Sequence, residues 1–157
     1  MSRINEIKRS LKKDLGATLS SLLVGYDKDL REAKDHLSMK GKTIELANKE
    51  QAAWLAYYDE RRVELEVIYD YVEKWAEGKR GSMFEHIHSN NPRALSDRAI
   101  NQIIDGRDDY IDACEIVLEV KEMFEKFKSL VDAFKQRGFS LRNITELRVN
   151  RIHDEVL

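Results

Sequence analysis

The chain has 157 residues, of which 42% are apolar and 36% are charged, with a formal net charge of −2. This length is enough for one domain with a usable core, and the net charge gives no overall attraction to nucleic acid, so phosphate binding would require a local basic patch. A single cysteine excludes a disulfide framework and fits a reducing compartment. We expect no signal peptide, because no apolar run follows the first charged residues, and no membrane-spanning helix, because no stretch approaches roughly 18 consecutive apolar residues.

The charged fraction is above the roughly 25% of average globular proteins, and one proline and seven glycines leave few helix breaks. We therefore expect an all-α, elongated protein with long amphipathic helices whose outer faces are charged.

The first predicted helix covers residues 3–15 and ends near Gly16. Its apolar face consists of Ile4, Ile7, Leu11 and Leu15. Its other side is basic and consists of Arg3, Lys8, Arg9, Lys12 and Lys13. Such a face is typical of a basic arm for nucleic acid or an acidic membrane, and also of an ordinary solvated surface.

The next two helices are predicted over residues 19–37 and 44–77, separated by a turn at Lys40-Gly41-Lys42, with Thr43 as the N-cap. We expect Gly78 to end the longer helix and residues 79–81 to form a flexible basic turn.

Residues 82–91 and Pro92 are predicted to form a loop, followed by a short helix that Ser96 caps and Gly106 ends. A heptad helix then runs from Tyr110 to the C-cap glycine Gly138. Its apolar positions are Tyr110, Ala113, Val117, Val120, Phe124, Phe127, Val131 and Phe134, widened by Ile116, Met123 and Leu130.

This seam predicts packing on other helices and on copies of the chain. The residues expected to carry oligomerisation are Tyr110, Val117, Val120, Phe124, Phe127, Val131 and Phe134. After Gly138, Ser140 is expected to cap a final helix with Leu141, Ile144, Leu147 and Ile152 on its apolar face.

The residue patterns of common catalytic sites are missing, including phosphate-binding glycine loops, a nucleophile elbow and a Cys-x-x-Cys pair. His86 and His88 would point the same way in an extended segment, but no further ligand stands at a recognised metal spacing. Cys114 lies beside the apolar seam, as an inert packed thiol does. We expect no enzyme activity, no cofactor and no metal site.

The stretch from Trp54 to Arg80 contains both aromatic and cationic residues. This combination can bind single-stranded nucleic acid, because the rings stack on bases and the cations contact phosphates. The candidate DNA contacts are Arg61, Arg62, Lys74, Lys79 and Arg80. The alternative is that the rings are core and the cations only solubilise the helix.

Three segments carry a family resemblance: residues 108–113, the apolar helix that follows, and residues 130–144 with Lys135-Gln136-Arg137-Gly138-Phe139 as their most specific part. Together they resemble the C-terminal region of UvsY-type recombination mediator proteins of tailed phages. Residues 11–15 are similar to the family's N-terminal helix, and the middle of the chain, longer than usual around residues 82–93, matches only loosely.

This resemblance implies a protein of the infected host cell's cytoplasm that binds single-stranded DNA without sequence preference. It also implies a ring-like homo-oligomer, a hexamer or heptamer, that helps load a RecA-like recombinase onto strands covered by single-strand-binding protein. The family's basic DNA-binding motif matches best at Tyr71–Trp75, where Lys74 occupies one basic position, Val72 stands at the other, and Lys79 and Arg80 are expected to compensate.

We therefore expect three parts: residues 1–81 with the DNA-binding helix, a linker at 82–106, and oligomerisation helices at 107–157. The alternative function, from a different class, is a self-assembling helical scaffold or adaptor without nucleic-acid binding.

Overall fold

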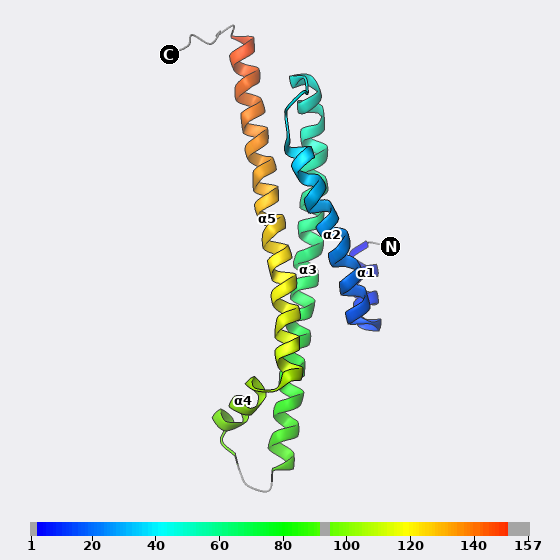
Figure 1. Cartoon of the computed structure of the whole chain (residues 1–157), viewed down its shortest axis with the longest axis vertical. Coiled ribbons are helices and arrows are strands. Elements are labelled where there is room, and N and C mark those ends of the chain that lie inside the picture. The colour runs from blue at the N-terminus through cyan, green and yellow to red at the C-terminus, as the bar shows by residue number, and fades with distance from the viewer. Residues whose placement is uncertain (1–2, 92–94, 151–157) are drawn as a thin grey trace. The chain divides into compact units, whose positions relative to one another are not determined.

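A computed structural model describes residues 3–91 and 95–150, and this part of the chain is entirely helical apart from its turns (Figure 1). The helices are α1 (Arg3–Lys13), α2 (Leu15–Leu37), α3 (Ile44–Asn90), α4 (Asp97–Asp105) and α5 (Asp108–Val149). The all-α prediction is confirmed. Pro92 and Ile152, assigned above to a loop and a helix, lie outside the described residues.

The helices belong to two compact units that do not follow the three predicted parts. Among the described residues, unit 1 consists of 3–18, 65–91 and 95–124, and unit 2 of 19–64 and 125–150. In unit 2, α2 and the first part of α3 form an antiparallel helical hairpin, visible in blue to teal in Figure 1.

The first helix ends at Lys13, three residues before the predicted glycine, Gly16. The Asp14 carboxylate accepts a hydrogen bond from the backbone N–H of Ala17 at 3.0 Å, so Asp14 is the N-cap of α2 and Gly16 lies inside that helix. An acidic side chain at a helix N-terminus accepts a hydrogen bond from a free N–H group and interacts favourably with the positive end of the helix dipole. This explains why the break falls at Asp14.

Four other predicted boundary residues are confirmed. Gly41 has a φ of 75° in the turn before α3, and the Thr43 hydroxyl accepts a hydrogen bond from the Leu46 N–H at 3.2 Å. The Ser96 hydroxyl accepts from the Ala99 N–H at 3.3 Å, and α4 ends immediately before Gly106.

The predicted end of the long helix at Gly78 is wrong, because α3 continues without interruption to Asn90. Residues 82–90, assigned above to a loop and a linker, therefore form helix, and so does the basic segment at 79–81. Packing accounts for the difference: Ile87 is buried with Ile100 and Ile104 of α4. A helical glycine costs only about 0.5–1 kcal/mol relative to alanine, which this burial offsets.

The predicted stop at Gly138 is also wrong, because α5 runs through Gly138 and Ser140 to Val149. The buried stripe of the helix continues past the glycine to Leu141, which is 2% exposed. A Cβ atom on Gly138 would lie 3.0 Å from Nε2 of Gln51 in α3, so the glycine permits a close approach between two helices of unit 2.

Two glycine substitutions should separate helix propensity from this close approach. A Cβ atom on Gly78 would meet no other atom within 4 Å, so Gly78→Ala should stabilise the protein by about 0.5–1 kcal/mol. Gly138→Ala gains the same propensity but displaces Gln51, so we expect a net loss of about 1 kcal/mol in urea unfolding. An equal gain from both substitutions would contradict the close approach.

Candidate nucleic-acid interface

Arg61 is buried in unit 2, which corrects its assignment as a DNA contact. It is 7% exposed, and its Nη1 donates to the Glu64 carboxylate at 2.7 Å. The Tyr26 hydroxyl also donates to Glu64, at 3.0 Å. A phosphate cannot reach this guanidinium without opening the core, and its charge is already matched by a buried carboxylate.

Arg62, the next residue, remains accessible. Its side chain is 25% exposed, and its Nε donates to the Asp59 carboxylate at 2.7 Å. Partly exposed ion pairs of this kind contribute little to stability, so a phosphate can compete for the guanidinium.

Lys79 and Arg80 of unit 1 are half-buried and hold α3 to the elements that follow it. The Lys79 ammonium donates to the backbone carbonyl of Asp109 at 2.8 Å and lies 5.3 Å from the centre of the Trp75 ring. Arg80 donates to the Tyr110 hydroxyl at 2.8 Å and to the Asn101 side chain at 3.0 Å.

Arg80 also pairs with Asp105 at 2.9 Å, so its guanidinium contacts both α4 and α5. The hydrogen bond to Tyr110, followed by the charge of Asp105, raises the pKa of Arg80 above its usual value despite some desolvation. Its main role in the structure is to connect three helices of unit 1.

Lys74 is exposed on α3, next to the half-buried Trp75. Lys74, Lys79 and Arg80 lie close together along α3 in unit 1 but project from different sides of the helix, whereas Arg61 and Arg62 belong to unit 2. Of the five predicted contacts, Lys74 is the most accessible to a strand.

The predicted oligomerisation seam is already part of the core of the single chain. In unit 1, Val120 is fully buried, Val117 is half-buried, Tyr110 packs on the Ile87 cluster, and Phe124 stacks on Tyr69 with ring centres 6.2 Å apart.

In unit 2, the rest of the seam packs on the helical hairpin. Phe134 stacks on Tyr58 at 4.9 Å, Phe127 meets the edge of Tyr26 at 5.7 Å, and Val131 is 2% exposed. These buried side chains offer a second copy no free surface. The seam is therefore an intrachain core in this structure, and assembly of several copies stays a prediction.

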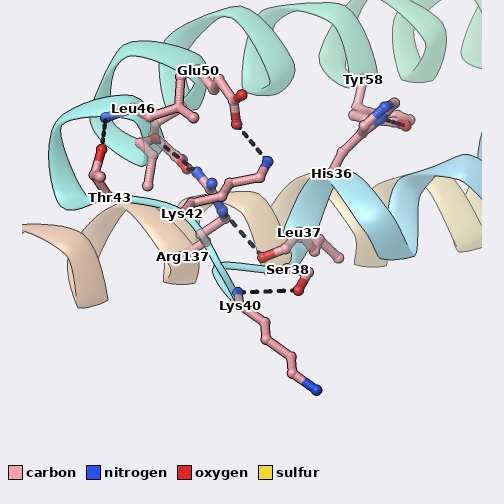
Figure 2. A network of polar contacts seen from close by, with 12 residues as sticks. His36, Leu37, Ser38, Lys40, Lys42, Thr43, Leu46, Glu50, Tyr58 and Arg137 are labelled. Atoms are coloured by element: carbon pink, nitrogen blue, oxygen red, sulfur yellow. Dashed lines mark hydrogen bonds and ion pairs between the residues drawn. The ribbon is translucent and has the colours of Figure 1, made fainter.

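Arg137, in the segment that carries the family resemblance, is a buried connector in unit 2. It is 5% exposed and reaches from α5 into the turn between α2 and α3 (Figure 2). Its Nε donates to the carbonyl of Leu37, the last residue of α2, at 3.2 Å, and its Nη1 donates to the carbonyl of Ala47 at 3.2 Å and to the Gln51 side chain.

Gln51 completes this connection, since its amide nitrogen donates to the Phe134 carbonyl at 2.6 Å. The sequence offered no signal for the role of either residue. Arg137 and Gly138, which belong to the segment that carries the resemblance, thus pack α5 against the start of α3.

Replacing Arg137 should destabilise the protein far more than replacing an exposed arginine of the same helix. Arg137→Ala leaves the Leu37 and Ala47 carbonyls without this donor, and we expect a loss of about 2 kcal/mol or more in chemical unfolding. Arg142→Ala, the control, should stay within about 0.5 kcal/mol. Equal effects of the two substitutions would contradict a connecting role.

Two neighbouring tyrosines share a polar cluster with Asp29 of α2. The Tyr57 hydroxyl donates to the Asp29 carboxylate at 2.9 Å, and the Tyr58 hydroxyl lies 2.8 Å from Nδ1 of His36, whose ring stacks on Trp54. Burial, and then the charge of Asp29, raises the pKa of Tyr58. Burial and the hydrogen bond to Asp29 raise the pKa of Tyr57.

Because the folded pKa of Tyr58 lies above its ordinary value of 10.0, the folded state holds this proton more tightly than the unfolded chain. The contribution is fully present below about pH 10 and is lost as the pH rises further. Tyr58→Phe should therefore weaken the decline of unfolding free energy between about pH 10 and pH 11. Circular dichroism in urea measures this, with Tyr71→Phe as control; an unchanged alkaline decline in Tyr58→Phe would contradict the argument.

An open groove of about 830 Å³ lies between the first part of α3 and the last part of α5 in unit 2. Ala52, Leu55 and Phe139 give it an apolar lining, and Phe139 is 55% exposed. Lys135 and Arg142 also line it. Apolar surface with cations beside it suits an amphipathic partner.

The structure brings no metal ligands together: among residues 3–91 and 95–150, no group of three or more His, Cys, Asp or Glu residues could hold an ion. His86 and His88 lie on the helix α3 instead of an extended segment, so they project in different directions and cannot share a metal as considered above. Cys114 is a half-buried free thiol.

In the part of the chain that the structure describes, no helix has both the length and the apolar character needed to span a membrane. Comparisons with protein-family models, with curated proteins and with solved structures give no match.

Proposed function

We propose that the protein is a recombination mediator. It binds single-stranded DNA without sequence preference and helps load a RecA-like recombinase onto strands covered by single-strand-binding protein. The observation that carries this proposal is the resemblance of residues 105–147, above all Lys135–Phe139, to the UvsY-type family of tailed phages.

The surface of α3 supports the DNA-binding part of the proposal. Lys74 is exposed beside Trp75, and the Lys79 ammonium lies over the Trp75 ring. A base can stack on an accessible ring for about 1–3 kcal/mol while a neighbouring lysine contacts the phosphate. Arg62 provides a further accessible cation in unit 2.

The proposal includes assembly into a ring of six or seven copies, again by resemblance. Because the heptad seam is buried within one chain, we place the contacts between copies on surfaces outside it. Several weak DNA sites on one ring bind a strand tightly through effective concentration, without any strong single site.

A scaffold or adaptor without nucleic-acid binding is the second candidate. The observation that favours it is the apolar groove beside Phe139, because an exposed apolar surface rimmed by polar side chains is typical of a protein-binding site. Binding of DNA distinguishes the two candidates.

Fluorescence anisotropy with a labelled oligothymidine strand tests the proposal. We expect binding at low salt that weakens steeply as salt rises, since each phosphate contact releases counterions. Lys74→Ala should weaken binding measurably, whereas Lys28→Ala, a change at an exposed lysine of α2, should not.

Absence of binding at low salt would overturn the mediator function in favour of the scaffold. Sedimentation with and without the strand measures the assembly in the same samples. A monomer under both conditions would remove the ring from the proposal.

A further inference from the structure

The outer face of α1 is the most one-sided charge concentration in the described helices, and no role assigned so far uses it. α1 has five Lys and Arg residues and one Glu in 11 residues, whereas the whole chain has 27 Lys and Arg against 29 Asp and Glu. Four of the cations form what we term the basic face: Lys8, Arg9, Lys12 and Lys13, all exposed.

Helix geometry arranges these four side chains in two rows. Lys8 and Lys12 are four residues apart, as are Arg9 and Lys13, so each row repeats at about 6 Å along the axis. The apolar residues Ile7 and Leu11 lie on the opposite side and are 7% and 2% exposed. The basic face therefore points away from the core.

An ordinary solvated surface does not account for these two rows of cations. Like charges four residues apart destabilise a helix, and the basic face contains two such pairs. Other exposed lysines pair with carboxylates, as in Lys28–Glu32 and Lys128–Glu125. Among the described residues, by contrast, Lys8, Lys12 and Lys13 form no ion pair.

The structure also distinguishes between two kinds of polyanion. An amphipathic helix on an anionic membrane inserts its apolar side among the lipids. In α1 that side is already buried, with Ile7 and Leu11 inside the protein. The exposed face of α1 carries cations, and these suit a ligand that presents regularly spaced charges, such as the backbone of a nucleic acid.

We infer that the basic face of α1 binds the phosphate backbone of single-stranded nucleic acid. This inference rests on the proposed DNA-binding function and assigns to it a site outside α3. A flexible strand can fit its phosphates to two straight rows of cations. Because side chains that contact only phosphates carry no sequence information, the site binds any sequence.

The test compares two variants that each lose four positive charges. One carries Lys8→Gln, Arg9→Gln, Lys12→Gln and Lys13→Gln. The control carries Lys28→Gln, Lys34→Gln, Lys49→Gln and Lys121→Gln, all at exposed positions outside the basic face. Anisotropy with labelled oligothymidine is measured across a salt series, and circular dichroism confirms that both variants remain helical.

Four phosphate contacts make the affinity for a single strand fall about 50-fold between roughly 50 and 200 mM salt. We expect the α1 variant to bind at least about tenfold more weakly at low salt. Its affinity should also fall less as salt rises, by a factor of up to about 50 over this range, while the control keeps most of its affinity and most of its salt dependence. Equal losses in the two variants would overturn the inference, because net charge alone would then explain the binding.

The outcomes separate the inference from the proposed function. If the wild-type protein binds no strand, the function fails and the inference falls with it. If the wild type binds and the α1 variant binds equally well, the function stands and the inference alone fails. Binding of wild type to phosphatidylserine vesicles but not to oligothymidine would assign the basic face to a membrane and overturn the inference.

Discussion

The fold of unit 2 depends on a buried guanidinium that has no carboxylate partner among the described residues. Arg137 is 5% exposed and donates to the last carbonyl of α2, to a carbonyl in the first turn of α3, and to Gln51. The C-terminal end of α2 carries the negative end of a helix dipole, which stabilises a cation there. Without these acceptors the burial of a charge would be strongly unfavourable. Gly138, the next residue, allows α5, which carries Arg137, to approach Gln51 closely.

Unit 1 uses a second arginine in a comparable way. Arg80 joins α3 to α4 through Asn101 and Asp105, and to α5 through Tyr110. A guanidinium suits this task because its several donors have a fixed, planar geometry, which a lysine lacks. Three of the cations that the sequence marked as notable, Arg61, Arg80 and Arg137, are thus occupied by contacts within the chain.

Local pattern predicted the presence of the helices, much of their apolar faces and the starts of α3 and α4. Thr43 and Ser96 were found because their hydroxyl groups satisfy helix N–H groups within three residues, an interaction that the sequence itself contains. Gly78 and Gly138 were misread because glycine is only weakly unfavourable in a helix, and distant contacts decided the outcome. For Gly78 the contact is Ile87 against α4, and for Gly138 it is Gln51, 87 positions earlier in the chain.

The same limit applies to the candidate DNA contacts. Residue type and spacing identify cations near aromatic rings, but they do not reveal which cations are engaged by distant groups, as Arg61 is by Glu64 and Lys79 by the Asp109 carbonyl. Once these contacts are known, the cations divide into those that the fold requires and those that it does not. Lys8, Lys12 and Lys13 belong to the second class, and their mutual repulsion is a cost that folding alone does not explain. A polyanion bound across the two rows would reduce that repulsion.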